Sequence, residues 1–252
     1  MPDHPRQLPL PLELRRGSTF AEFVDRDNPV PRALVERVAR AHGEPQVLLW
    51  GAPGTGKTHL LQAACREALE AGDRAAWWPL SALAPHEGHA LVGLEALDLL
   101  CLDELELSAR GPALERAVFG LINRCRTQGC RLLLAARARP CDGPWRLPDL
   151  RSRLAWGPVI QLARLDDAGR REAVQRRARS LGWTIPGPAL EYLLVHCPRD
   201  MVSLMTMIDA LDRESLELRR PITPALVRRI LERCDLGEGP PAHGSGAGQA
   251  EG

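Results

Sequence analysis

Short apolar runs alternate with helix-like patterns through the first two thirds of the chain. Five runs have the length and continuous hydrophobicity of buried strands, and they cover residues 46–50, 74–80, 99–102, 131–136 and 158–163. The segments between them place apolar residues with helical spacing, as in residues 58–72. Strands that alternate with helices form a parallel sheet that is covered on both faces. The pattern therefore predicts an α/β domain.

The pattern changes after Asp166, where the strand-like runs end. Prolines divide the following segment into helices, which we expect at about 167–182, 187–196, 199–219 and 223–235. From Gly237 onward the chain is low in complexity and lacks the apolar residues needed to fold. We expect four parts, namely an extended tail, the α/β domain, a small helical domain and a disordered tail, over residues 1–17, 18–164, 165–236 and 237–252.

Composition and charge narrow the class of protein. The 252 residues are 44% hydrophobic and 26% charged, which is ordinary for a globular protein. A formal charge of +1 lacks the excess of positive charge that a duplex-DNA binder normally carries, so strong direct binding to duplex DNA is not expected. Seven cysteines without a C-x-x-C pair suit a reducing compartment, and no run of about 20 apolar residues could span a membrane. We therefore expect a cytoplasmic location and no membrane partner.

The most specific motif surrounds a single lysine. All other basic residues among the 33 are arginines, and Lys57 lies in GAPGTGKT, which matches the phosphate-loop pattern G-x-x-x-x-G-K-[ST] between a strand and a helix. In such a loop the backbone amides and the lysine bind phosphates, and the threonine hydroxyl holds magnesium. A glycine turn that matches by chance is the alternative. The motif predicts binding of ADP or ATP with magnesium by Gly51, Pro53, Gly54, Thr55, Gly56, Lys57, Thr58 and His59.

A second strand is expected to deliver an acid to the magnesium. The run LDLLCLDELE ends a buried strand at Asp103, where the ligands of open parallel sheets gather. This is the Walker B pattern, in which Asp103 joins Thr58 at the magnesium and Glu104 polarises a water molecule. Acidic residues after an apolar run also cap helices, and Glu104 could serve only that purpose.

The segment LPDLRSRLAWG, residues 147–157, carries a family resemblance. It resembles the Box VII helix of the DnaA/Hda family of AAA+ proteins, whose final arginine reaches the nucleotide site of a neighbouring subunit. The resemblance covers nearly the whole folded length and implies an AAA+ phosphate-loop domain followed by a helical lid. By this match the finger is Arg153, and Arg151 points to nearly the opposite face of the helix. A solvated surface arginine is the alternative.

The N-terminal tail also resembles a family motif. Prolines keep the stretch QLPLPLEL, residues 7–14, extended, and its leucines have no core to enter. QLPLPL is similar to the peptide by which Hda-type members of the family dock on the sliding clamp, the beta subunit of DNA polymerase III. A sticky leader without a partner is the alternative. The match implies that the clamp is bound by Gln7, Leu8, Leu10, Pro11 and Leu12.

Two positions depart from the family pattern. Arg137 occupies the sensor I position, which is usually polar or acidic, and Val202 occupies the sensor II position, although Arg199 lies one turn earlier. Both departures place nucleotide hydrolysis by this chain in doubt. The resemblance then implies a protein that holds nucleotide, docks on the DNA-loaded clamp and lends Arg153 to ATP bound by DnaA. Such a protein would prevent re-initiation and associate with the nucleoid through the clamp, and it could form homo-oligomers.

Two other functions compete with this interpretation. A DnaA-type initiator would bind origin DNA through a further C-terminal domain, for which no pattern follows the lid. A helicase loader or clamp-loader subunit would share the phosphate loop, but it would need strong hydrolysis or contacts to single strands. It would also not be expected to begin with the QLPLPL peptide.

Overall fold

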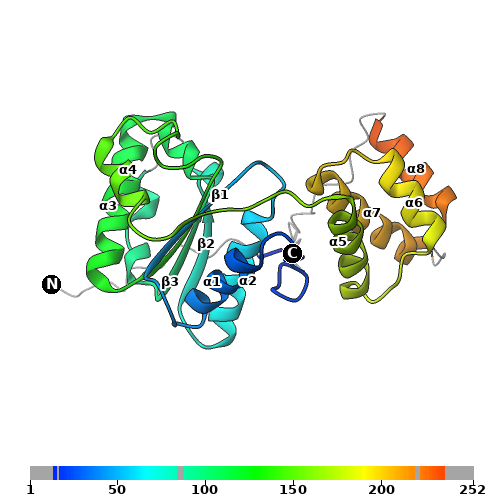
Figure 1. The fold of residues 1–252 in the computed structure, drawn as a ribbon, viewed down its shortest axis with the longest axis horizontal. Coiled ribbons are helices and arrows are strands. Elements are labelled where there is room, and N and C mark those ends of the chain that lie inside the picture. Colours follow the sequence, from blue (N-terminus) through cyan, green and yellow to red (C-terminus); the bar gives the residue numbers. More distant parts are fainter. Residues whose placement is uncertain (1–13, 16, 84–87, 219–221, 236–252) are drawn as a thin grey trace, which may run out of the picture. The chain divides into compact units, whose positions relative to one another are not determined.

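The computed structural model describes residues 14–15, 17–83, 88–218 and 222–235. The chain divides into two compact units, Met1–Gly169 and Arg170–Gly252. The first contains the sheet, and the second consists of helices in its described part (Figure 1).

The described part of the first unit contains a sheet of five parallel strands, in the order β2-β3-β4-β1-β5. Their bounds are β1 Gln46–Trp50, β2 Ala75–Pro79, β3 Leu99–Asp103, β4 Arg131–Ala136 and β5 Val159–Gln161. The predicted strands are confirmed, with differences at the ends of β2, β3 and β5. The edge strand β5 is the shortest, and its residues are not fully buried.

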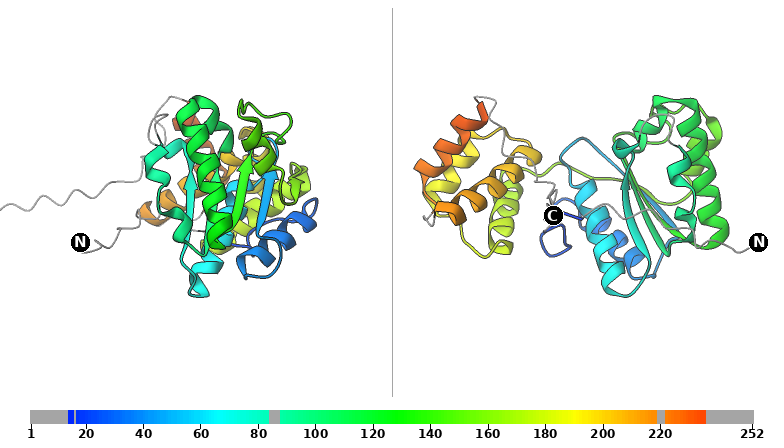
Figure 2. Two further views of the ribbon diagram at one scale, coloured as in Figure 1. Left: turned by 90° about the vertical axis from the view of Figure 1, so that its left-hand side faces the viewer. Right: turned by 180° about the vertical axis from the view of Figure 1, so that it is seen from behind.

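Helices cover both faces of this sheet, as expected for parallel strands (Figure 1). One face carries α1 (Pro29–Ala39) and α2 (Lys57–Glu70), and the other carries α3 (Pro112–Gln128) and α4 (Pro148–Leu154). Figure 2 shows the same layers from the side and from behind. Alternate strand residues enter the two cores: Val47 and Leu49 pack on the side of α1 and α2, and Leu48 packs on the side of α3.

The structure also contains short elements that the apolar pattern does not predict. In the described residues between β2 and α3, the 3-10 helices are η1 Leu80–Ala82, η2 Gly88–Leu91, η3 Leu94–Ala96 and η4 Leu105–Arg110. Helix α1 is also absent from the predicted elements, although the sequence carries its signals. Pro29 opens the helix, and Val35, Val38 and Ala39 are buried at helical spacing.

The register of the sheet brings three loops to one edge. Trp50 at the end of β1 pairs with Ala136 at the end of β4, and Leu102 of β3 pairs with Leu134 of β4. The residues that follow these strands therefore meet at the carboxyl edge of the sheet. We call this the C-terminal edge, and the side where the strands begin the N-terminal edge.

The second unit is helical throughout its described part. Its helices are α5 Asp167–Ser180, α6 Gly187–His196, α7 Met201–Leu218 and α8 Pro224–Asp235, of which α5 begins within the first unit. The predicted helices are confirmed to within two residues at each end. They enclose their own core, which includes Val174, Leu193, Ile208, Leu211 and Val227. Among the described residues, none of the helices is long and apolar enough to cross a membrane.

Candidate functional site

The predicted phosphate loop links β1 to α2 at the C-terminal edge. Gly51, Gly54 and Gly56 all have positive φ, at 156°, 77° and 96°. A Cβ atom on Gly51 would lie 2.7 Å from the backbone oxygen of Leu162, and one on Gly56 would lie 2.8 Å from the ring of Phe23. The loop therefore favours glycine at all three positions for its conformation, and at Gly51 and Gly56 also for its packing.

Lys57, the first residue of α2, folds its side chain over this loop. Its Nζ donates to the backbone oxygens of Gly51 at 2.7 Å and of Ala52 at 2.9 Å. Burial lowers the pKa of Lys57, against the opposing effect of Asp103 and Glu106. The ammonium group is thus held at the loop by backbone acceptors, which a phosphate could replace.

Thr58 and Asp103 meet as the magnesium prediction requires. The Thr58 hydroxyl donates to Oδ2 of Asp103 at 2.6 Å, and Trp77 donates its indole N–H to the same oxygen at 3.4 Å. Asp103 is only 2% exposed, and burial raises the pKa of its carboxyl. A hydroxyl beside a buried carboxylate is a hard oxygen donor set, so these residues fit a magnesium ion that also binds phosphate oxygens.

Glu104 forms hydrogen bonds through both its backbone and its side chain. Its φ of 59° is in the left-handed region, and its backbone N–H donates to Oδ1 of Asp103 at 2.8 Å. Its carboxylate accepts from the backbone N–H of Ser81 at 3.1 Å. Glu104 therefore fastens the end of β3 to the segment after β2, and its role toward a water molecule stays a prediction.

Arg137 follows β4 beside the loop. Its Nε contacts Oε1 of Glu106 at 2.8 Å, and its backbone N–H donates to Oε2 of the same carboxylate at 3.1 Å. Glu106 lies in η4, three residues after Asp103. The positive charge of Arg137, at the position predicted to be sensor I, is thus paired with an acidic neighbour. Glu106 belongs to the Walker B run, but the apolar pattern does not reveal this pairing because it does not predict η4.

The segment before α1 also packs at the phosphate loop. The imidazole Nε2 of His59 lies 2.7 Å from the backbone oxygen of Thr19, and Phe23 is buried against Gly56. Asn28 exchanges two hydrogen bonds with the backbone of Ala163, at 2.8 and 3.1 Å. The side chain of His59 is therefore used within the fold, and the predicted contact of His59 with phosphate would come from its backbone N–H. The sequence analysis did not predict that this segment packs at the loop, although its two phenylalanines indicated a buried contact.

Arg153 lies at the other edge of the sheet. Its backbone oxygen accepts from the side chain of Gln46 at 2.7 Å, and Gln46 is the first residue of β1. Four residue steps of about 3.3 Å separate Gln46 from Trp50, which precedes the phosphate loop. Arg153 is therefore placed about 13 Å along the strand direction from the loop of its own chain.

The surroundings of Arg153 include an exposed tryptophan. Trp156 is 40% exposed, Arg126 stacks on its ring, and the guanidinium of Arg153 lies 5.7 Å from the ring centroid. The Nε atoms of Arg151 and Arg153 are both buried, and neither has a hydrogen-bond partner among the described residues. Burial alone does not distinguish the two arginines, but the contact with Trp156 involves Arg153.

The remaining predicted site residues fall elsewhere. The tail residues Gln7, Leu8, Leu10, Pro11 and Leu12 lie outside the described residues. In the lid, Arg199 is exposed just before α7, and Val202 is 58% exposed on that helix. Asp200 caps the helix, because it accepts from the backbone N–H of Ser203 at 2.9 Å.

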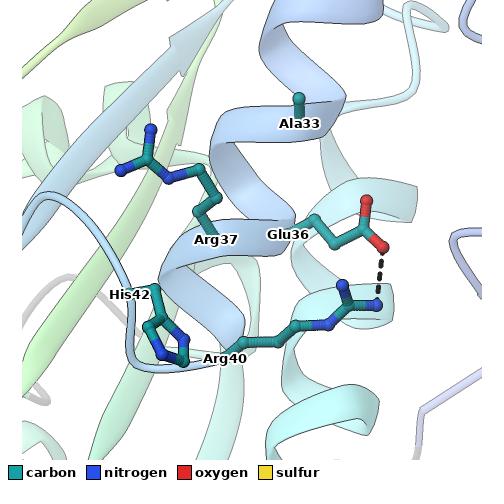
Figure 3. Close-up of a pocket in the computed structure, with 5 residues that line it drawn as sticks. All are labelled: Ala33, Glu36, Arg37, Arg40 and His42. Atoms are coloured by element: carbon teal, nitrogen blue, oxygen red, sulfur yellow. Dashed lines mark hydrogen bonds and ion pairs between the residues drawn. The ribbon is translucent and has the colours of Figure 1, made fainter.

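A separate hollow of about 360 Å³ lies at the end of α1. The residues that line it are Ala33, Glu36, Arg37, Arg40 and His42 (Figure 3). Arg40 is paired there with Glu36 at 2.7 Å and with Glu67 at 2.8 Å. His42 shortly precedes β1, so the hollow lies toward the N-terminal edge and is not the place where the phosphate loop and Asp103 meet.

Known proteins share this architecture. A family model described as the lid domain of Hda matches residues 167–231. Domain III of the replication initiation protein DnaA from Thermotoga maritima is similar with a TM-score of 0.73 at 18% identity, over 88% of this chain and 98% of that chain. AMPPCP-bound DnaA from Aquifex aeolicus reaches a TM-score of 0.65 at 20% identity, over 89% and 71% of the two chains.

A further match is the RuvB Holliday junction branch migration motor from Thermotoga maritima. Its TM-score is 0.61 at 20% identity, over 87% of this chain and 73% of that chain. These likenesses, together with the lid match and the parallel sheet, confirm the predicted fold class. The fold is an AAA+ α/β domain followed by a small helical lid.

Proposed function

We propose that this chain, an AAA+ protein of the Hda/DnaA family, regulates chromosomal replication initiation by stimulating the hydrolysis of ATP bound to DnaA. Three parts of the chain would contribute: the phosphate loop would hold nucleotide, the N-terminal tail would dock on the sliding clamp, and Arg153 would act in trans. The observation that carries the proposal is the separation of Arg153 from the phosphate loop of its own chain.

The phosphate loop and Asp103 support the nucleotide-binding part. Bound ADP or ATP with magnesium would supply phosphate oxygens and a divalent cation at the C-terminal edge. Lys57 would turn from the loop carbonyls toward the phosphates, and Thr58 with Asp103 would hold the magnesium. AMPPCP-bound DnaA has the same fold, which is consistent with a nucleotide ligand here.

The position of Arg153 supports action on a neighbouring subunit. An arginine at the N-terminal edge cannot reach the C-terminal edge of the same sheet, since the strand length lies between them. Its guanidinium instead lies beside the exposed Trp156, on a surface that another AAA+ subunit could meet. Arginines supplied in trans stabilise the charge that develops on the transferred phosphoryl group and raise rates by about 10³ to 10⁵.

The tail part of the proposal rests on residues 7–12 of the sequence. Gln7 would offer its amide at the rim of a clamp pocket, and Leu10 and Leu12 would fill apolar subsites. Prolines reduce the entropy that an extended peptide loses on binding. Docking would hold the AAA+ domain near DNA-bound DnaA and raise its effective concentration there.

The test is single-turnover hydrolysis of labelled ATP on purified DnaA, with DNA-loaded clamp and this protein. We expect the wild-type chain to accelerate hydrolysis, and Arg153→Ala to remove the acceleration while clamp binding and nucleotide affinity persist. Arg151→Ala is the matched control, because its Nε is also buried on α4 without a hydrogen bond among the described residues. Equal loss in both variants would reject the assignment to Arg153.

The clamp contribution is tested in the same assay. Deletion of residues 1–12 should abolish clamp binding and the acceleration that depends on loaded clamp, whereas the melting temperature should not change. Acceleration by the deletion variant equal to that of the full chain would reject the docking role. No acceleration by the wild-type chain with loaded clamp would reject the proposed function.

The likeness to domain III of DnaA also supports a second candidate, a DnaA-like initiator. This function requires direct binding to duplex DNA, which a formal charge of +1 does not favour. Binding of labelled origin duplex at two salt concentrations separates the two candidates. Tight and salt-dependent duplex binding in the absence of clamp would favour the initiator.

A further inference from the structure

Arg137 and Glu106 form an ion pair at the C-terminal edge, beside the phosphate loop. Arg137 directly follows Ala136, whose backbone oxygen accepts from the N–H of Gly51, the first loop residue, at 3.3 Å. Glu106 follows Asp103 in η4, after the neighbouring strand β3. The pair therefore originates from two adjacent strands whose ends lie beside the place where phosphates would bind.

The two side chains of this ion pair differ in solvent exposure and in their hydrogen bonds. The side chain of Glu106 is 14% exposed; its Oε2 accepts from the backbone N–H of Arg137, and its Oε1 forms an ion pair with Nε of Arg137. The side chain of Arg137 is 61% exposed. The terminal amino groups of its guanidinium make no hydrogen bond among the described residues, so both remain available as donors. Glu106 is thus the fixed partner and Arg137 the movable one.

Both charges act on Lys57. The negative charge of Glu106 raises the pKa of Lys57 and the positive charge of Arg137 lowers it, which places both within electrostatic range of the lysine. Lys57 is the residue expected to meet the terminal phosphates. A triphosphate brings more negative charge to this region than a diphosphate, and the additional charge lies at the end of the phosphate chain.

We propose that Arg137 and Glu106 determine the preference of the site for ATP over ADP: Arg137 binds the third phosphate, and Glu106 competes for the same guanidinium. The inference rests on the proposed nucleotide site. With ADP, the guanidinium stays on the carboxylate of Glu106. With ATP, the third phosphate draws the guanidinium away from Glu106. Phosphates and carboxylates both accept strong, charge-assisted hydrogen bonds from an arginine.

The two partners therefore have opposite effects on the same ratio. Removal of the arginine takes away a charged donor to the third phosphate, which corresponds to a loss of about 10-fold in relative affinity for the triphosphate. Removal of the charge on Glu106 frees the guanidinium. This should favour the triphosphate by a smaller factor, about 3-fold, since a pair with one exposed partner is weak.

The test measures the dissociation constants of ADP and of AMPPCP, each with magnesium, by calorimetry on the full chain. Arg137→Ala should weaken AMPPCP about 10-fold while ADP binding changes little. Glu106→Gln keeps an oxygen for the backbone N–H of Arg137 and should raise the preference for AMPPCP. Arg139→Ala is the matched control, because Arg139 is similarly exposed but pairs with Asp142 at 2.7 Å, and it should leave the ratio unchanged.

The possible results separate the inference from its premise. An unchanged ratio in Arg137→Ala, or an equal loss for both nucleotides, would overturn the inference and leave the nucleotide site intact. A lower preference for AMPPCP in Glu106→Gln would overturn the competition by Glu106. If the wild-type chain bound neither nucleotide, the nucleotide-binding part of the proposed function would fail together with the inference.

Discussion

The two edges of the sheet use their charged residues in different ways. At the N-terminal edge, Arg131 of β4 is 15% exposed in its side chain, and its guanidinium is occupied by a cluster of acceptors. These acceptors are the backbone oxygens of Val38, Ala39 and Asp98 and the carboxylate of Asp73. At the C-terminal edge, Lys57 is partly buried and Asp103 is buried. Burial lowers the pKa of Lys57 and raises the pKa of Asp103, which favours the neutral form of each.

The charged residues at the N-terminal edge stabilise the fold, whereas those at the C-terminal edge have the features expected of a ligand-binding site. The acceptors around Arg131 compensate for its burial, so that edge stabilises the folded chain. Asp103 accepts its hydrogen bonds from neutral donors, so burial disfavours the carboxylate, and Glu104 beside it adopts a left-handed φ. Polar groups in such an arrangement are expected where a ligand completes the site. Substitutions at the two edges should therefore affect different measurements.

The largest effect on stability is expected at Arg131. Arg131→Ala would remove a charged donor from three backbone oxygens and from the carboxylate of Asp73, so the free energy of unfolding should fall by about 3 kcal/mol. Urea denaturation measures this change. Arg74→Ala is the control, since Arg74 forms an exposed pair with Asp98 at 3.0 Å and should alter stability much less than Arg131→Ala does. Equal effects of the two substitutions would contradict a structural role specific to Arg131.

Lys57→Ala should show the reverse pattern. The affinity for ADP should fall by about 30-fold, because a charged donor to the phosphates is lost. The stability of the nucleotide-free protein should change little, since Lys57 is partly buried and its partners there are loop carbonyls. Calorimetric titration and urea denaturation of the same preparation measure both quantities. Loss of stability without loss of affinity would show that Lys57 supports the fold and not the ligand.

The strands and the lid helices could be predicted because burial dominates their sequences. The run Arg131–Ala136, for example, is apolar after its first residue because both faces of β4 are covered. The strand, loop and helix around Lys57 were predictable because the glycines and the lysine occur at fixed spacing, and the binding of phosphate there stays a prediction. In both cases a local pattern carries the information.

The pairing between distant polar residues could not be predicted in the same way. The contact of Glu106 with Arg137 depends on the 3-10 helix η4 and on the strand order, which places β3 next to β4. The cluster around Arg131 likewise joins three segments that are far apart in the sequence. Such contacts depend on tertiary packing, and an arginine-rich sequence offers many equivalent candidates for each carboxylate.

Asp98 and Asp103 lie at opposite ends of β3, so they allow the two edges to be compared with the same type of residue. The expected effects are smaller than those at Arg131 and Lys57. Burial raises the pKa of Asp103 above its ordinary 3.8, whereas hydrogen bonds from Arg74 lower the pKa of Asp98 to about 2. The folded state therefore binds the proton of Asp103 more tightly than the unfolded state does, and this contribution to stability declines as the pH rises above 3.8. The contribution of Asp98 has the opposite sign: it is present above pH 3.8 and is lost as the pH falls toward 2.

The two asparagine variants should consequently move stability in opposite directions at pH 7. Asp103→Asn removes a buried charge and keeps an oxygen for the Thr58 hydroxyl, so the nucleotide-free protein should gain on the order of 1 kcal/mol, and the gain should shrink as the pH is lowered toward 4. Asp98→Asn should lower the free energy of unfolding by less than about 1 kcal/mol, because the ion pair of Asp98 with Arg74 is exposed. Urea denaturation at several pH values measures both changes. Destabilisation by Asp103→Asn at neutral pH would mean that the C-terminal edge supports the fold as the N-terminal edge does, and the contrast between the edges would be wrong.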